Sequence, residues 1–330
     1  MTDINFQKVC IYGAGAIGGW LGVRLAQAGC AVSVVARGAT LEALTRSGLR
    51  LHDAGLESAV PVRASANPAD LGVQDLVVIA VKAPALLDVA RHIGPLIGPD
   101  TVVLTAMNGV PWWFFQGFGG RFENTRLSAV DATGEIGAAI PARSVIGCVV
   151  HASCSVDAPG VIRRHFGNGL ILGEPSGVQT GRVTQLAALL SQAGFEASVS
   201  AQIQKDTWYK LWGNMTVNPI SAITGATTDL IMDDDLVRGF VSSVMLEAKE
   251  IGARIGIPMD QQPEDRHAVT RKLGAFKTSM LQDVEAGKTI ELDALVTVVK
   301  ELGALVDVPT PFTDALLGLA RLHARGRGLY

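Results

Sequence analysis

Cysteine, charge and long apolar runs are all scarce in this chain of 330 residues. Four cysteines occur without a CxxC pair, too few for a disulfide framework or a zinc site, so we expect reduced thiols in a cytoplasmic protein and no bound metal. The 28 Lys and Arg do not exceed the 31 Asp and Glu, which argues against nucleic acid as a partner. Because the chain start lacks a signal-peptide pattern and no uncharged apolar run reaches about 18 residues, we expect neither export nor a membrane span.

The abundant residues indicate a packed α/β protein. Apolar residues make up 48% of the chain, which is enough for large cores, and glycine occupies 37 positions. The glycines fall in particular loops rather than in repeats, which favours tight turns between strands and helices. At about 150 residues per domain, the length predicts two domains.

The first part of the chain alternates short apolar runs with helical patterns. Strands are predicted at residues 8–12, 31–36, 75–81 and 101–106, and helices at residues 17–28, 41–47 and 85–93. This alternation is typical of a parallel sheet with helices on its faces. Residues 144–173 change to strands with Gly and Pro turns, and we expect them to add an antiparallel edge to the sheet.

After about residue 200 the strand pattern ends and helical periods follow. Helices are predicted at residues 205–224, 234–255, 263–286, 291–306 and 311–325. The predicted fold is therefore α/β, with an N-terminal doubly wound sheet of Rossmann type at residues 1–200 and a C-terminal all-helical domain at residues 201–330.

A GxGxxG motif follows the first predicted strand and opens a helix, which is the context that a dinucleotide site requires. Gly13 would make the tight turn, Gly15 would let a pyrophosphate approach the backbone, and Gly18 would let helix and strand pack closely. The expected contacts with the cofactor come from Gly13, Ala14, Gly15, Ala16, Ile17 and Gly18.

The end of the second predicted strand selects the cofactor. NAD-binding sites usually have an acid there, whereas this chain has Arg37 and no acid. A guanidinium can pair with a 2′-phosphate, so we expect NADP(H) rather than NAD(H), although Arg37 as a solvated loop residue is the alternative.

A polar helix face begins the second half of the chain. Lys210, Asn214 and Asn218 are spaced at i, i+4 and i+8, which places one ammonium and two amides on the same face. Such a face suits a small oxygen-rich substrate, and a solvated polar stripe is the alternative. Ser279 and Glu291 taken alone are ordinary residues for helix ends.

The motifs together give the chain a resemblance to a known family. The matching segments are GAGAIGG at 13–19, VKA at 81–83, MNGV at 107–110, His151-Ala152, PGV at 159–161, LGE at 172–174, KLWGNMTVNP at 210–219, SMLQD at 279–283 and TIELD at 289–293. In this order and spacing, over essentially the whole length, the sequence resembles the ketopantoate reductase (2-dehydropantoate 2-reductase) family.

The resemblance implies NADPH-dependent reduction of a 2-oxo acid, 2-dehydropantoate, to pantoate in the pathway to pantothenate and coenzyme A. It implies that Lys210 is the general acid and that Glu291 lies near Lys210, the substrate and the cofactor. The implied substrate contacts are Asn108, Asn214, Asn218 and Ser279, and the further implied cofactor contacts are Arg37, Lys82, Asn108 and Ala152. A positioned ammonium can protonate the alkoxide that hydride transfer leaves, so the chemistry of these residues fits the role.

Two departures from the family pattern leave the substrate open. The aromatic segment Trp112–Phe115 could wall a cleft, or it could be ordinary core, and Thr228 stands where family members often have a substrate-binding Asn. The alternatives are therefore a related dehydrogenase for a bulkier 2-oxo acid and a non-catalytic NADP(H) sensor. The apolar helical domain is also compatible with a homodimer.

Overall fold

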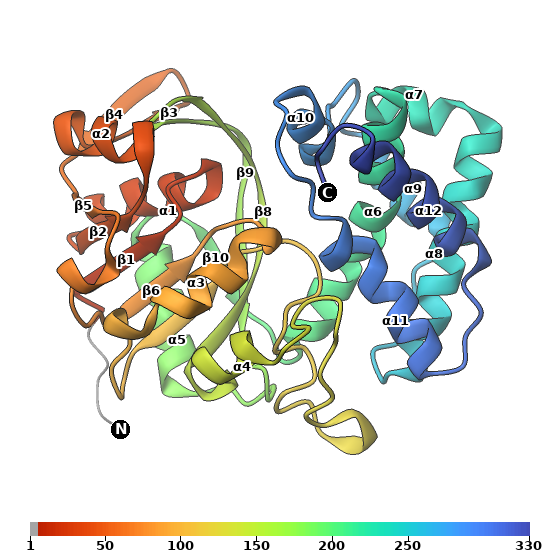
Figure 1. Cartoon of the computed structure of the whole chain (residues 1–330), viewed down its shortest axis with the longest axis horizontal. Coiled ribbons are helices and arrows are strands. Elements are labelled where there is room, and N and C mark those ends of the chain that lie inside the picture. Colours follow the sequence, from red (N-terminus) through yellow and green to blue (C-terminus); the bar gives the residue numbers. More distant parts are fainter. Residues whose placement is uncertain (1–5) are drawn as a thin grey trace. The chain divides into compact units, whose positions relative to one another are not determined.

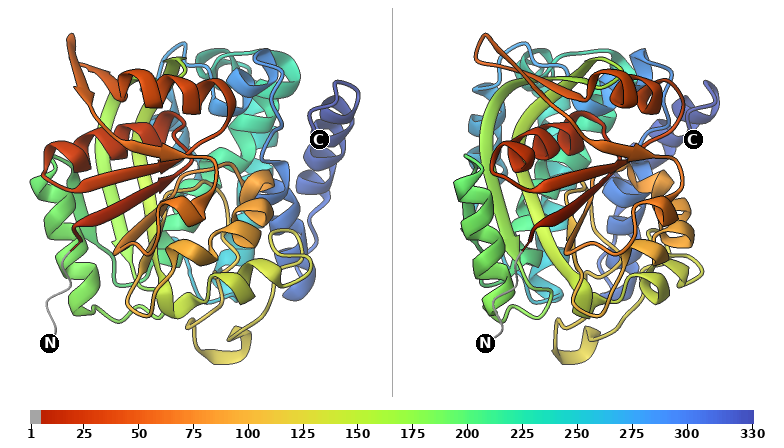
Figure 2. Two further views of the ribbon diagram at one scale, coloured as in Figure 1. Left: turned by 60° about the vertical axis from the view of Figure 1, so that its left-hand side comes forward. Right: turned by 90° about the vertical axis from the view of Figure 1, so that its left-hand side faces the viewer.

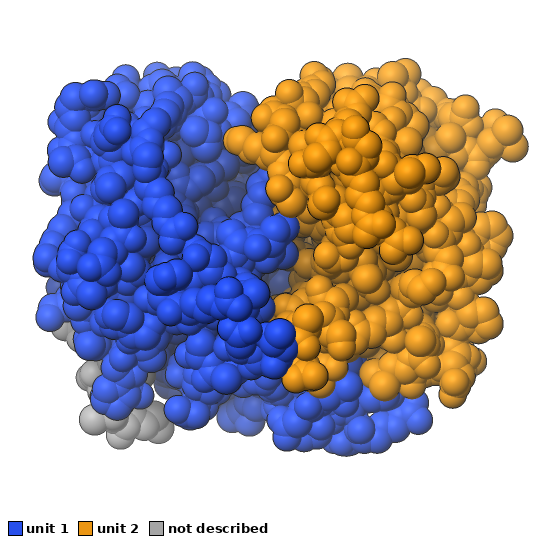
Figure 3. Space-filling model, viewed as in Figure 1, with its two compact units in different colours: residues 1–107, 113–125, 133–203 blue, residues 108–112, 126–132, 204–330 orange. Residues whose placement is uncertain are grey.

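The computed structural model describes residues 6–330, which fall into two compact units (Figures 1 and 3). Unit 1 runs to Met107 and adds Trp113–Thr125 and Thr133–Ile203. Unit 2 comprises Asn108–Trp112, Arg126–Ala132 and Gln204–Tyr330. Two short segments from the first half of the chain thus group with the C-terminal helices. The boundary predicted from the sequence, near residue 200, assigns both segments to the first domain.

Within the described residues, unit 1 contains one ten-stranded sheet. Its strands are β1 (Lys8–Tyr12), β2 (Ala31–Val35), β3 (Leu49–Asp53), β4 (Leu56–Val60), β5 (Arg63–Ser65), β6 (Leu76–Ile79), β7 (Val102–Thr105), β8 (Val145–Ala158), β9 (Val161–Gly173) and β10 (Glu196–Val199). The order is β4-β3-β9-β8-β7-β6-β1-β2-β5, and β10 pairs with β9. The run from β8 to β5 is parallel throughout, which confirms the predicted Rossmann-type fold.

Residues 144–173 do form an antiparallel pair, β8 and β9, but the prediction that they end the sheet is wrong. Strand β9 also pairs in parallel with β3, and β3 pairs with β4, so the sheet continues beyond them. The hairpin β3–β4 turns at Ala54 and Gly55, both with positive φ (50° and 80°), as two-residue hairpin turns require. The sequence analysis predicts no strands at residues 49–60, so this hairpin is an addition to the predicted sheet.

Successive residues of a strand point to opposite faces of the sheet, and all residues of the central strands β6 and β7 are buried, so both faces are covered. On one face α1 (Ala16–Gln27) and α5 (Gly181–Gln192) share a core with β1 and β2, and Trp20 of α1 meets Phe195 edge-on at 4.8 Å. Figure 2 shows α3 (Leu86–His92) on the opposite face. The helix α2 (Gly38–Ser47) contacts β5 at the end of the sheet.

The aromatic residues at 112–115 are core residues. All four are at most 2% exposed, and the Trp113 indole donates to Thr105 Oγ1 at 3.2 Å. A Cβ on Gly147 would lie 2.6 Å from the Trp113 ring, so glycine is required where this ring packs on β8. Of the two hypotheses for this segment, the structure supports core packing.

Unit 2 is helical. Its helices are α6 (Ile203–Thr224, of which Ile203 belongs to unit 1), α7 (Thr228–Asp233), α8 (Asp235–Arg254), α9 (Pro263–Arg271), α10 (Ser279–Glu285), α11 (Val298–Leu305) and α12 (Pro311–Arg325), with a π-helical turn at Asp293–Thr297. The indoles of Trp208 and Trp212 on α6 donate to the carbonyls of Ala248 and Met245 on α8. These bonds let two large aromatic side chains be buried without an unpaired N–H group. Among residues 6–330, no helix combines the length and apolar character needed to cross a bilayer.

The prediction of one helix over residues 263–286 is wrong, because the structure has two. Helix α9 ends at Arg271, and Gly274 follows with φ +62°, a conformation in which other residues are strained. Helix α10 then restarts from Thr278, whose side chain accepts from the backbone N–H of Leu281. The helical period continues through the break, which is why periodicity alone did not reveal it.

Asp53 at the end of β3 ties three elements of unit 1 together, and its removal is expected to destabilise the fold. Arg24 of α1 and Arg164 of β9 both bind it, with Arg164 Nε 2.8 Å from Oδ1. Burial opposes the charge on Asp53, but the bonds to Arg164 and Arg24 outweigh it and lower the pKa.

We predict that Asp53→Asn lowers the free energy of unfolding by about 2 kcal/mol at pH 7. Because the pKa of Asp53 is lowered in the folded state, its contribution is present above the unfolded-state pKa and lost as the pH falls through the folded-state value. The difference from wild type, measured by urea denaturation, should therefore shrink toward pH 3. A difference that does not depend on pH would contradict this role.

Candidate functional site

The glycine turn after β1 has the geometry that a pyrophosphate site needs. Gly13 has φ +98°, and a Cβ there would meet Val81 at 2.7 Å. A Cβ on Gly18 would lie 2.0 Å from the Gly13 carbonyl oxygen, so helix α1 could not approach the turn with any larger residue. Gly15, by contrast, has no neighbour within 4 Å of its Cβ position. Two glycines thus serve packing, and the third leaves the approach to the backbone open.

The N-terminus of α1 is suited to an anion. Gly15 is its N-cap, no side chain caps the first turn, and no acid lies in that turn. The first amide N–H groups of a twelve-residue helix are thereby left to a ligand, and the helix dipole favours negative charge there. The residues present fit the phosphates of a dinucleotide.

Arg37 forms the N-cap of α2, directly after β2, and is largely exposed. Its guanidinium lies 2.8 Å from Asp88 of α3 in an ion pair in which both side chains are about half exposed, at 60% and 47%. An exposed pair of this kind contributes at most about 1 kcal/mol, so a phosphate can compete for the guanidinium.

Tyr12, the last residue of β1, was missed by sequence reasoning. Its side chain is 4% exposed, and its hydroxyl has no hydrogen-bond partner among residues 6–330. Burial, and after it the negative charge of Asp88, raises the pKa of Tyr12. A polar residue directly after the apolar run at residues 9–11 was the available signal. The Tyr12 hydroxyl lies in the charge environment of Arg37 and Asp88.

Lys82 and Ala152 lie on other strand connections of unit 1. Lys82 follows β6 and precedes a short 3₁₀ turn, and it is partly buried. Ala152 lies in β8 at a bulge, where the register with β9 shifts between His151 and Ala152. Gly167 faces this bulge with φ +78°, and a Cβ there would lie 2.4 Å from the His151 carbonyl. Bulges interrupt the ladder of hydrogen bonds and leave backbone groups for other partners.

The structure brings Lys210 and Asn108 into direct contact within unit 2. Lys210 Nζ donates to Asn108 Oδ1 at 2.8 Å, although the two residues are 102 positions apart. Lys210 lies on α6, and Asn108 begins the short segment Asn108–Trp112 that groups with the C-terminal helices. The side-chain amide of Asn108 therefore orients the ammonium, a role that the sequence did not indicate.

Asn108 is held by the residues that follow it. Val110 N donates to the Ala294 carbonyl at 2.9 Å, and Gly109, at φ +84°, passes so close that a Cβ would lie 2.5 Å from the same oxygen. Ala294 belongs to the π-helical turn Asp293–Thr297, and Glu291 lies two residues before that turn. π-Helical turns are rare and frequent at functional sites.

Asn214 and Asn218 continue the face of α6 that begins at Lys210. Asn218 is 7% exposed and Asn214 is partly buried, and neither side-chain amide has a hydrogen-bond partner in the described part of the chain. Pro219 follows within the helix and lacks an N–H, which removes the backbone bond to the Met215 carbonyl. Amides that no protein group engages are available to a ligand rich in oxygen atoms.

Ser279 is the first residue of α10, and its side chain is exposed. The capping bond at this helix end comes from Thr278, so the Ser279 hydroxyl is not used as the cap. Thr228 is different, because its hydroxyl donates to the Gly274 carbonyl at 2.6 Å and accepts from Phe276 N. Thr228 is 1% exposed and stabilises the connection between α9 and α10, which argues against a contact with substrate.

The predicted residues therefore form two sets. Unit 1 holds the segment Gly13–Gly18 with Arg37, Lys82 and Ala152, and unit 2 holds Asn108, Lys210, Asn214, Asn218, Ser279 and Glu291. The structure pairs Asn108 with Lys210 directly. The roles assigned to the individual residues stay predictions.

A parallel sheet whose first strand leads through a glycine turn into a helix with open amides is typical of dinucleotide-binding proteins of Rossmann type. The family model for ketopantoate reductase PanE/ApbA matches residues 9–177, and the model for its C-terminal domain matches residues 202–324. The chain belongs to the ketopantoate reductase family, which confirms the resemblance read from its motifs.

Individual relatives agree with this membership. A 2-dehydropantoate 2-reductase of Mesorhizobium japonicum is 49% identical over 98% of this chain and 100% of its own length. A crystal structure from Ralstonia solanacearum MolK2, assigned to the ketopantoate reductases, is 57% identical with a TM-score of 0.96 and covers 99% of this chain and 100% of its own. A D-mandelate dehydrogenase, solved with NADH and anilino(oxo)acetate, shares the fold at 21% identity, with a TM-score of 0.83 and coverage of 98% and 100%.

The glycine turn gives a matched pair of variants. Gly18→Ala should destabilise the protein by about 1–3 kcal/mol, because its Cβ would overlap the Gly13 carbonyl. Gly15→Ala should leave the melting temperature unchanged, because nothing lies near its Cβ, and should weaken NADPH binding at least about tenfold by blocking the phosphate approach. Thermal denaturation and NADPH fluorescence titration measure the two effects. Wild-type NADPH affinity in Gly15→Ala would show that phosphate does not bind at this turn.

Proposed function

We propose that this protein is an NADPH-dependent 2-dehydropantoate 2-reductase, which reduces 2-dehydropantoate to pantoate for the synthesis of pantothenate and coenzyme A. The observation that carries the proposal is the bond from Lys210 to Asn108 on a helix face that continues into two unpartnered amides. The relative from Mesorhizobium japonicum, which bears this enzyme name and matches the whole chain, supports it.

Unit 1 would hold the cofactor and unit 2 the acid and the substrate contacts. The bound dinucleotide supplies the hydride that reduces the ketone carbon, and Gly13–Gly18 would hold its phosphates. Arg37 would bind the 2′-phosphate, with Lys82 and backbone at Ala152 as further contacts. These assignments rest on the open amides of α1 and on the position of Arg37 directly after β2.

Lys210 would act as the general acid. As the ketone oxygen gains negative charge, the ammonium stabilises it and transfers a proton from Nζ. Asn108 Oδ1 accepts from Nζ at 2.8 Å and so restricts the directions in which the remaining protons point. Because Asn108 accepts with an amide oxygen, it orients the ammonium without taking its proton.

The other polar residues of unit 2 would bind the substrate. Asn214 and Asn218 carry amides that can bind hydroxyl and carbonyl oxygens, and Ser279 offers an exposed hydroxyl to a carboxylate. Glu291 would act near Lys210, where a carboxylate favours the charged form of the amine.

The two alternative functions lose support. A bulkier, aromatic 2-oxo acid was suggested by the segment at residues 112–115, and these side chains are buried in packed cores. A non-catalytic NADP(H) sensor has no need of the oriented ammonium at Lys210.

We also propose a cytoplasmic location and a homodimer, with no nucleic acid partner. Four free cysteines support a reducing compartment. Leu319 and Leu322 on α12, 60% and 71% exposed, support a subunit contact, and the net charge of −3 gives no basis for binding nucleic acid.

Arg37→Ala should raise the KM for NADPH about tenfold or more and change the KM for NADH little, because a bond between guanidinium and phosphate contributes roughly 1.5–3 kcal/mol. Steady-state kinetics with both cofactors measure the difference. Arg46→Ala, on the exposed last turn of the same helix, is the control and should match wild type. Equal effects of Arg37→Ala on both cofactors would remove this residue from the choice of cofactor.

Lys210→Ala should reduce kcat at least about 100-fold while NADPH still binds, since a positioned acid contributes roughly 10²–10⁴ in rate. Lys205→Ala, on the first turn of α6 with an exposed side chain, should keep wild-type turnover. Oxidation of NADPH with 2-dehydropantoate, followed by absorbance, gives the rates. Turnover near wild type in Lys210→Ala would exclude Lys210 as the acid.

A further inference from the structure

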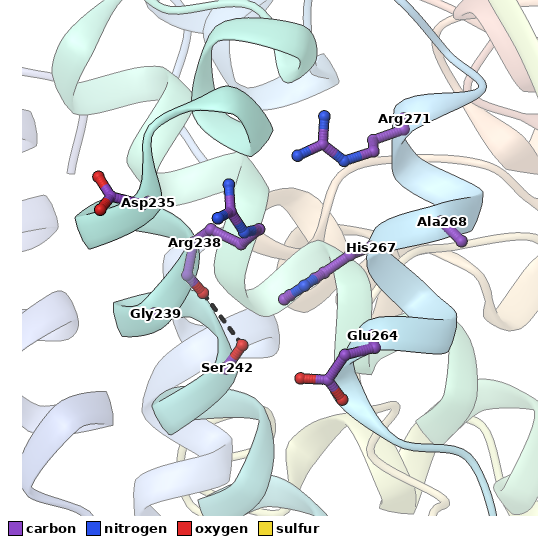
Figure 4. Close-up of a pocket in the computed structure, with 8 residues that line it drawn as sticks. All are labelled: Asp235, Arg238, Gly239, Ser242, Glu264, His267, Ala268 and Arg271. Atoms are coloured by element: carbon purple, nitrogen blue, oxygen red, sulfur yellow. Dashed lines mark hydrogen bonds between the residues drawn. The ribbon is translucent and has the colours of Figure 1, made fainter.

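Helices α8 and α9 of unit 2 border a pocket of about 530 Å³ that is open to solvent and has no part in the proposed reaction (Figure 4). A cavity of this volume is large enough for a small molecule. The polar side chains that line it come from both helices and are Asp235, Arg238, Ser242, Glu264, His267 and Arg271. They lie on different helices from Lys210 and its neighbours on α6.

One end of the cavity is cationic. Arg238 Nη1 and Arg271 Nη2 both donate to the Met232 carbonyl at the end of α7, at 2.7 and 2.6 Å. Sharing one oxygen brings two guanidinium groups close together, an arrangement that an anion would stabilise. Arg271 also pairs with the exposed Asp233, whereas Arg238 forms no ion pair within the described residues.

The other end of the cavity is acidic. Glu264 lies on the first turn of α9, two helical turns before Arg271, which corresponds to about 10 Å along the helix axis. Figure 4 shows its carboxylate extending toward α8 on the side where Ser242 lies. Asp235 also lines the pocket, but it lies on α8 beside Arg238 and its carboxylate points away from His267 in the same view.

His267 lies between the two ends. It is 6% exposed, and its Nε2 has no hydrogen-bond partner among residues 6–330. Burial lowers its pKa, and Arg238 and Arg271 add to this effect against Glu264, so the imidazole is neutral near pH 7 and can donate or accept one hydrogen bond. The ring extends from α9 toward α8 and lies between the arginines and Glu264 (Figure 4).

We propose that this cavity binds a small zwitterion, namely an amino acid whose ammonium and carboxylate groups are separated by several carbon atoms. The carboxylate would bind Arg238 and Arg271, the ammonium would bind Glu264, and His267 would meet the ligand between them. A simple anion would face the negative charge of Glu264, and a simple cation would face the two arginines. The charge order of the cavity therefore favours a ligand with both charges, and the inference stands apart from the proposed reductase activity.

Isothermal titration calorimetry on the full chain tests the site with 4-aminobutyrate as the probe. We expect saturable binding of 4-aminobutyrate, with butyrate and butylamine at least about tenfold weaker because each lacks one charge. Inorganic phosphate separates a site for anions from a site for zwitterions. Phosphate or butyrate binding as tightly as 4-aminobutyrate, or no saturable binding of the zwitterion, would overturn the proposal.

Two variants test the two ends of the cavity separately. Arg238→Gln should weaken 4-aminobutyrate at least about tenfold, and Glu264→Gln, an exposed position where folding is expected to be retained, should do the same. Arg321→Gln on α12 and Glu250→Gln on α8 remove the same charges from exposed positions outside the cavity and should bind as wild type. Unchanged binding in Glu264→Gln would show that no ammonium is recognised there.

Discussion

The bond between Lys210 Nζ and Asn108 Oδ1 is the interaction on which the functional interpretation depends. A lysine side chain has many rotamers in solution, so an ammonium that must protonate one oxygen needs a partner that limits its directions. Asn108 can do this only because Gly109 adopts a positive φ and Val110 is bound to the π-helical turn at Ala294. The position of the Lys210 ammonium thus depends on backbone geometry at a segment far from α6 in the sequence.

The glycine turn of unit 1 meets a different requirement by similar means. Gly13 and Gly18 lack a Cβ because their neighbours leave no room, and Gly15 lacks one although room is available. The first two contribute to packing, so their replacement acts on stability, whereas Gly15 contributes only an open approach to the helix amides. A short motif therefore contains two glycines that packing requires and one that it does not, and only the surrounding atoms distinguish them.

Local patterns predicted much of the fold, and contacts between distant residues explain what they missed. The helix at Pro311–Arg325 begins and ends as predicted, since Pro at its start and Gly after its end are local signals. The break between α9 and α10 depends on Gly274 and on two hydrogen bonds between Thr228 and this connection. Thr228 lies more than 40 residues earlier in the chain, so no local pattern reveals these bonds. Spacing placed Lys210, Asn214 and Asn218 on one face, but no pattern could show that Asn108 orients Lys210 or that the aromatic side chains at 112–115 are buried.

Two carboxylates away from the candidate site show how the described part of the chain matches charge with protein partners. Glu174, at 4% exposure, binds the Arg182 guanidinium, and Glu301 accepts from the backbone N–H groups of Ser128 and Ala129. Such pairing is expected, because an unsatisfied buried group costs more than a bond contributes. Among residues 6–330, His267 Nε2 departs from this rule, as do several other buried atoms, including Tyr12 Oη and Trp20 Nε1. At His267 charged side chains of α8 and α9 also converge on the pocket, so a ligand bound there would complete a hydrogen bond that the protein leaves unmade.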